Sequence, residues 1–109
     1  MLVPVTSASL SPSQRQLVDL MRRINYGRIE ALHIRAGAPV FDPPPRVVRK
    51  VKIGGENSPR REPSPNEPLK KDLIEMFDHM ALVGDGVVRS IEVKNGMPFS
   101  LDIEETVGV

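Results

Sequence analysis

The basic side chains between positions 46 and 61 are the residues of this chain best placed to do chemistry. Six of them lie close together: Arg46, Arg49, Lys50, Lys52, Arg60 and Arg61. Guanidinium and ammonium groups at this density neutralise phosphates, so the stretch predicts an anion or nucleic-acid contact. Two other interpretations stay open. The charges could protect an edge strand from aggregation, or they could pair with carboxylates near the C-terminus: Asp102, Glu104 and Glu105.

The distribution of charge favours these two alternatives over phosphate binding. The net charge of the 109 residues is only +1, and three Phe, one Tyr and no Trp leave little surface for base stacking. Residues 46–71 hold eight basic and three acidic groups, whereas residues 72–109 hold two basic and eight acidic groups. The chain therefore combines a basic middle with an acidic C-terminal part, without the overall positive charge that is typical of nucleic-acid-binding proteins.

The remaining polar residues predict no metal, cofactor or catalytic site. His33 and His79 are the only histidines, and a metal site needs three or four convergent ligands. The absence of cysteine excludes disulfides, thiolate zinc sites and a cysteine nucleophile. Asp72 and Glu75 suit the preference of a helix start for negative charge, and the glycine clusters lack the spacing of a nucleotide loop. We therefore expect a protein that is not an enzyme and holds no cofactor.

A helix is expected to open the first half of the chain, after a flexible lead-in over residues 1–10. Ser11 can cap this helix, Pro12 suits its first position, and Gln14 completes a capping box. It is expected to stop near residues 25–27, where Gly27 can take a left-handed C-cap. Apolar residues at spacings of three and four form one stripe: Leu17, Leu20, Met21 and Ile24.

A hairpin is expected to follow this helix. Residues 28–35 read as a strand, residues 36–38 as a turn, and the return strand runs to Ile53. Residues 42–45, Asp-Pro-Pro-Pro, interrupt the return strand because proline cannot donate to a ladder. This step could be read as a polyproline ligand. The neighbouring strands favour a rigid bend instead, either a bulge or an edge crossing.

The second half repeats this order of elements. A polar linker over residues 54–67 is expected to be mobile, and a helix start is predicted at residues 66–68. Strands over residues 87–94 and 98–105 flank Asn95-Gly96, which is a strong hairpin signal. The apolar stripe of the second helix consists of Leu69, Leu73, Met76, Phe77 and Met80.

The two halves match closely enough to predict an internal repeat. Hairpin residues correspond at an offset of 59: Gly27 with Gly86, Gly37 with Gly96, and Pro39 with Pro98. The helices match at an offset of 56, which implies a three-residue insertion. We predict that residues 11–41 superpose on residues 69–100 about an approximate two-fold axis. The predicted fold is α+β, one domain over residues 1–109 in which two αββ units, 11–53 and 68–109, form a four-stranded antiparallel sheet with two helices on one face.

Glu30 and Arg89 are equivalent positions in this repeat, and each shares an alternating pattern with apolar strand residues. A charge that faces the helices is costly unless it is paired. Because a two-fold axis brings equivalent positions together, we predict that Glu30 and Arg89 pair across the middle of the sheet. The alternative is that each side chain reaches solvent separately.

The segment Ile24-Asn25-Tyr26-Gly27-Arg28-Ile29-Glu30, followed by a further strand and Gly37, resembles the YezD-like proteins, a small bacterial family of uncharacterised function. The resemblance covers residues 17–53 and recurs over residues 73–106, where Ile103-Glu104-Glu105-Thr106 is similar to the family's return strand. The prolines at 43–45 depart from the family pattern. The resemblance implies an α+β fold and supplies no catalytic residues.

These features predict a small bacterial-type protein that acts as a non-enzymatic binding or assembly module through a protein surface. Its expected partner is an unknown protein or a second copy of itself, as a homodimer. The alternative is a nucleic-acid-binding accessory protein that uses residues 46–61. The N-terminus lacks the basic start and the apolar run of a signal peptide, and no segment is as long as a membrane span. We therefore expect a cytoplasmic protein with no membrane partner.

Overall fold

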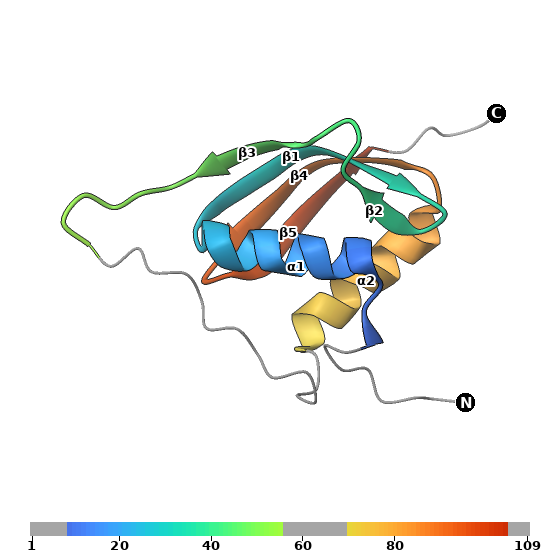
Figure 1. The fold of residues 1–109 in the computed structure, drawn as a ribbon, viewed down its shortest axis with the longest axis horizontal. Coiled ribbons are helices and arrows are strands. Elements are labelled where there is room, and N and C mark those ends of the chain that lie inside the picture. The colour runs from blue at the N-terminus through green and yellow to red at the C-terminus, as the bar shows by residue number, and fades with distance from the viewer. Residues whose placement is uncertain (1–8, 56–69, 105–109) are drawn as a thin grey trace.

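The computed structural model describes residues 9–55 and 70–104, which form two helices and an antiparallel sheet of five strands (Figure 1). The predicted lead-in, most of the predicted mobile linker and the helix start at 66–68 lie outside the described residues. Along the chain the elements are α1 (Pro12–Ile24), β1 (Gly27–Arg35), β2 (Ala38–Val40), β3 (Arg46–Arg49), α2 (Lys71–Val83), β4 (Gly86–Lys94) and β5 (Met97–Glu104).

The first helix begins as the sequence predicts. The Gln14 backbone N–H donates to the Ser11 hydroxyl at 3.3 Å, and the Ser11 backbone N–H donates to Gln14 Oε1 at 2.9 Å. This reciprocal pair satisfies two of the amides that a helix start leaves without partners. Pro12 occupies the first position of the helix, and Leu17 and Met21 on its apolar stripe are fully buried.

The sheet has five strands where the sequence predicted four. Its order is β2-β1-β4-β5, and β3 pairs with β1. β2 lies opposite residues 33–35 of β1, whereas β3 lies opposite residues 27–30 of the same strand. The prolines at 43–45 divide the predicted return strand in two because they cannot donate to the ladder. The predicted rigid bend is therefore an interruption between two strands that share one edge of β1.

A bulge in the centre of β1 changes which side chains face the core. Ile29, Leu32 and Ile34 are buried, so the alternation skips one residue between 29 and 32. Ala31 has a positive φ of 60° at this point. Ala31 and Arg89 are left out of the ladder between Glu30–Ser90 and Leu32–Val88, so each central strand has one bulged residue and the register is unchanged. The extra residue reverses the faces of all that follow. Glu30 therefore lies on the face opposite Ile29.

The predicted pairing of Glu30 with Arg89 is wrong. Glu30 accepts hydrogen bonds from Arg28 Nε at 2.7 Å and from Arg46 Nε at 2.9 Å. Arg89 instead donates to the carboxylate of Glu104 on β5. Because the bulge turns Glu30 away from the helices, its carboxylate finds cations on its own strand and on β3, and it needs no partner across the centre of the sheet.

The two central strands, β1 and β4, pair symmetrically, so that the start of each strand lies opposite the end of the other. Gly27 lies opposite Val93, and Gly86 lies opposite Ile34. The buried core joins side chains of these strands with those of both helices: Leu17, Met21, Ile24, Ile29, Leu32, Ile34, Leu73, Met76, Phe77, Met80, Val88, Ile91 and Val93. The sheet and the helices thus share one hydrophobic cluster.

Each hairpin turn closes on the end of the helix from the other half of the chain. The Gly96 N–H donates to the Asn25 carbonyl at 2.9 Å, and the Gly37 N–H donates to the Gly84 carbonyl at 2.8 Å. These bonds satisfy carbonyls at the two helix ends, which have no N–H donor within their own helix. They also link the two halves through backbone contacts.

The predicted offset of 56 between the helices is wrong. Both helices hold 13 residues, and their first residues, Pro12 and Lys71, are 59 positions apart, as are their last, Ile24 and Val83. No insertion therefore separates α2 from its hairpin. A shift of three residues is close to one helical turn of 3.6 residues, so the apolar stripes align almost equally well at either offset.

Candidate functional site

The six basic residues between positions 46 and 61 fall into three groups, two of which the structure describes. Arg46 and Arg49 lie on β3, at the edge of the sheet, and both are exposed. Lys50 and Lys52 follow β3 on a segment that projects beyond the sheet, drawn in green in Figure 1. The third group, Arg60 and Arg61, lies outside the described residues.

The sheet order keeps Arg46 and Arg49 apart from Asp102 and Glu104, whereas Lys50 and Asp102 line one hollow on the sheet. β3 borders β1 at one edge, whereas β5 carries both carboxylates at the other edge, with β1 and β4 between them. Glu104 pairs with Arg89 instead. The third predicted partner, Glu105, lies outside the described part of the chain. Apart from Lys50 and Asp102, the opposite charges of the two edges are separated by the width of the sheet.

Glu30 neutralises part of the basic edge. Its carboxylate lies 2.7 Å from Arg28 Nε and 2.9 Å from Arg46 Nε. The hydrogen bond from Arg28 is the main cause that lowers the pKa of Glu30 below its ordinary value, and the charges of Arg28 and Arg46 add to it while partial burial opposes it. This cluster ties the start of β3 to the middle of β1.

The Glu30 cluster predicts a specific pH response. A lowered pKa in the folded protein means that the carboxylate stabilises the fold above the pKa of the unfolded chain, and that this contribution is lost as pH falls through the folded pKa. Arg28→Gln should raise the pKa of Glu30 more than Arg46→Gln does. A carboxyl-carbon NMR titration of Glu30 measures both shifts. An unchanged midpoint in Arg28→Gln would contradict the assignment.

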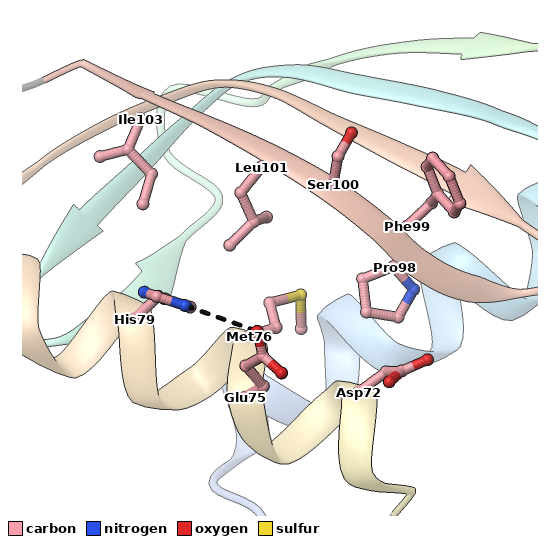
Figure 2. A pocket seen from close by; sticks show the side chains of 9 residues that line it. All are labelled: Asp72, Glu75, Met76, His79, Pro98, Phe99, Ser100, Leu101 and Ile103. Atoms are coloured by element: carbon pink, nitrogen blue, oxygen red, sulfur yellow. Dashed lines mark ion pairs between the residues drawn. The ribbon is translucent and has the colours of Figure 1, made fainter.

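A hollow of about 420 Å³ lies between α2 and β5 (Figure 2). We call it the acidic hollow, and its lining residues are Asp72, Glu75, Met76, His79, Pro98, Phe99, Ser100, Leu101 and Ile103. Leu101 and Ile103 extend from β5 toward α2, while Ser100 points away from the helix. The hollow therefore has an apolar floor, and the carboxylates of Asp72 and Glu75 stand on its helix side.

The strand that borders the acidic hollow is the terminal strand of the sheet. β5 has eight residues, and in residues 9–55 and 70–104 it pairs with β4 alone. A terminal strand presents backbone N–H and C=O groups along its outer side that can pair with another chain. Asp102 and Glu104 are exposed, and they alternate along β5 with Leu101 and Ile103. The edge is thus apolar toward α2 and acidic on the other face.

One aromatic residue in this hollow departs from the sequence-based expectation. Strict alternation along residues 98–105 predicts that Phe99 shares the buried face with Leu101 and Ile103, but its exposed fraction is 63%. The ladder between β4 and β5 shifts register between Glu92 and Val93, which breaks the alternation at this point. The Phe99 ring instead forms a cation–π contact with Lys94, whose ammonium nitrogen lies 3.8 Å from the ring centroid.

Sequence reasoning missed the acidic hollow as a site. Asp72 and Glu75 fitted the helix dipole, and Leu101 and Ile103 fitted a buried strand face, so neither pair needed a function. The missing information was that β5 is a terminal strand with α2 beside it, which is a property of tertiary structure. The available signal was the excess of acidic residues after position 72.

The histidines do not lie in a metal cluster within the described ranges. His79 Nε2 is 3.8 Å from a Glu75 carboxylate oxygen, one helical turn away. His33 lies on β1 opposite Val87 and Val40. Among residues 9–55 and 70–104, no group of three His, Cys, Asp or Glu side chains is placed to hold a metal ion.

Comparisons with family models, curated proteins and solved structures give no match to this chain. In the part of the chain that the structure describes, neither helix is long and apolar enough to cross a membrane. The class that the coordinates define is therefore an α+β protein with two helices and a five-stranded antiparallel sheet. Its function has to be inferred from its own surfaces.

Proposed function

We propose that this protein is a non-enzymatic binding and assembly module that adds an extended protein segment to the outer edge of β5. The observation that carries the proposal is the combination of a terminal strand of eight residues with an apolar hollow beside it. Strand addition uses backbone hydrogen bonds for affinity and alternate side-chain pockets for specificity. The β5 edge offers the backbone groups for these hydrogen bonds, and the acidic hollow offers a pocket for side chains.

The charges around the hollow favour a basic segment. Side chains on one face of an added strand would enter the hollow and bury against Met76, Leu101 and Ile103. Burial of one aliphatic side chain contributes about 1.5–3 kcal/mol. Side chains on its other face would lie beside the exposed carboxylates of Asp102 and Glu104. A sequence that alternates aliphatic and basic residues fits both faces.

We also propose that the fold arose by duplication of one αββ unit. In this arrangement both helices lie on one face of the sheet. Three observations support this arrangement: equal helices 59 positions apart, the symmetric register of β1 and β4, and the reciprocal bonds of Gly37 and Gly96. In Figure 1 both helices run below the sheet. The resemblance to the YezD-like family also stays a prediction.

The first test is binding of a synthetic peptide of alternating lysine and valine, as long as β5, measured by isothermal titration calorimetry. We expect saturable binding, and at least about tenfold weaker binding of a matched peptide of alternating glutamate and valine, because like charges repel at the rim. Asp102→Lys should weaken binding of the lysine peptide several-fold, because it reverses a charge on the face of β5 that meets the lysines. The control Asp78→Lys makes the same charge change on α2 outside the hollow and should not.

Equal binding of the two peptides, or no binding of either, would contradict the proposed function. Equal effects of Asp102→Lys and Asp78→Lys would also contradict it, because only Asp102 lies on β5. Both side chains are exposed, so neither change is expected to disturb the core.

A second candidate function is nucleic-acid binding through residues 46–61. The exposure of Arg49, Lys50 and Lys52 at one edge favours it. Phosphate binding releases counterions and is therefore strongly salt-dependent. Retention on a DNA column that falls steeply with salt, and falls further in Arg49→Gln, would support this candidate. Lack of retention at low salt would exclude it.

A further inference from the structure

The segment after β3 alternates basic and aliphatic residues, which is the pattern proposed above for a segment bound at β5 and the acidic hollow. Residues 50–53 read Lys-Val-Lys-Ile, and we call them the basic arm. Val51 has an exposed fraction of 48% and Ile53 of 92%, which are high values for β-branched side chains. The Lys50 N–H donates to the Tyr26 carbonyl at 2.7 Å and anchors the start of the arm. The arm then projects past the end of the sheet (Figure 1).

The basic arm and the acidic hollow lie on opposite edges of the same molecule. The arm continues from β3 beside β1, whereas the hollow lies between β5 and α2. β1 and β4 separate the two, so a contact between the basic arm and the acidic hollow is a contact between molecules. Complementary charge on opposite edges steers one copy toward another and suppresses like-to-like contact.

We propose that the basic arm of one molecule adds as a strand to β5 of a second copy, and that the two copies exchange arms reciprocally. This inference rests on the proposed function and names its partner. In a strand, Val51 and Ile53 share one face and the two lysines share the other. With the apolar pair in the acidic hollow, Lys50 and Lys52 lie on the face of Asp102 and Glu104. The alternation of the arm thus matches the alternation of β5.

Reciprocal exchange makes the assembly closed. Each copy donates one arm and receives one, so the same contact occurs twice about a two-fold axis and neither hollow stays empty. Exchange also covers Ile53, the most exposed of the large apolar side chains in the described ranges. The added strand occupies the outer edge of β5, which removes a terminal edge from each sheet.

The test is a charge exchange between two variants of the full chain, measured by sedimentation velocity. The arm variant carries Lys50→Glu and Lys52→Glu, and the hollow variant carries Asp102→Lys and Glu104→Lys. We expect wild-type protein to associate, each variant alone to associate at least about tenfold more weakly, and an equimolar mixture to recover association. Recovery is expected because the arm of each variant then meets charges of opposite sign on β5 of the other variant.

Two further variants keep the result independent of folding defects. Ile53→Ser should weaken association without charge change, since its side chain has few contacts within one molecule. Asp78→Lys should associate as wild type does. A monomeric wild-type protein, or variants whose mixture does not recover, would overturn the arm exchange. If the lysine peptide still binds such a monomer, the proposed function stands. If it does not, both proposals fail.

Discussion

Replacing Gly27 by alanine is expected to destabilise the fold by about 3 kcal/mol, because the new methyl group would strike the backbone of β3. An ideal Cβ at Gly27 lies 2.1 Å from the Val48 carbonyl oxygen and 3.0 Å from Arg49 Cα. The φ of Gly27 is +155°, which other residues rarely adopt. Since the obstacle is backbone, no side chain can move aside, and relief requires β3 to leave the edge of β1.

A matched control separates this crowding from the cost of backbone conformation alone. Gly84 has a φ of +74°, and no atom lies within 4 Å of an ideal Cβ there. Gly84→Ala should therefore cost only about 1 kcal/mol, the penalty for a side chain at positive φ. Urea denaturation of both variants measures the difference. Equal losses of stability would mean that β3 does not pack against Gly27 as described.

The second large effect is expected from Met80→Ala, at about 3 kcal/mol. Met80 is fully buried on α2, in the cluster that also holds Leu17 and Met21 of α1 and the inward side chains of β1 and β4. Truncation removes apolar contacts and leaves a cavity that the surrounding helices and strands fill only in part. Because one cluster joins both halves, unfolding should remain a single cooperative transition.

Leu82 provides the control on the same helix. Its exposed fraction is 84%, so Leu82→Ala should change the free energy of unfolding by no more than about 0.5 kcal/mol. Thermal and urea unfolding followed by circular dichroism measure both variants. A small effect at Met80, or two separate transitions in the wild-type protein, would contradict a shared core.

Local signals in the sequence predicted much of the fold. The capping box at Ser11 and Gln14 defines the start of α1, and Asn95-Gly96 defines the turn between β4 and β5. Each of these motifs acts through atoms a few residues apart, so the sequence alone carries the information. The apolar stripes of the helices contribute in the same way.

The features that failed to follow from the sequence depend on distant contacts. The bulged residue Ala31 interrupts the pairing of β1 with β4 without changing its register, and alternation alone placed Glu30 on the wrong face. The offset of the helices was wrong because an amphipathic stripe repeats almost every turn. The prolines predicted an interruption of the return strand. That its two parts form separate strands, β2 and β3, depends on how each part pairs with β1.

The candidate site divides in the same manner. The basic arm is a continuous segment, and its charge was visible in the sequence. The acidic hollow combines Glu75 of α2 with Leu101 of β5, and only the tertiary structure brings them together. The sheet order places the basic arm and the acidic hollow at opposite edges, which favours a contact between two molecules over one within a molecule.

The most direct test of strand addition at β5 uses two methylated forms of the lysine–valine peptide. In one form the valine amides carry N-methyl groups, and in the other the lysine amides do. Successive amides of a strand point to opposite sides, so only one form can still pair with β5. The account predicts that one form binds as the parent peptide does and the other binds at least about tenfold more weakly. Equal affinity of the two forms would contradict it.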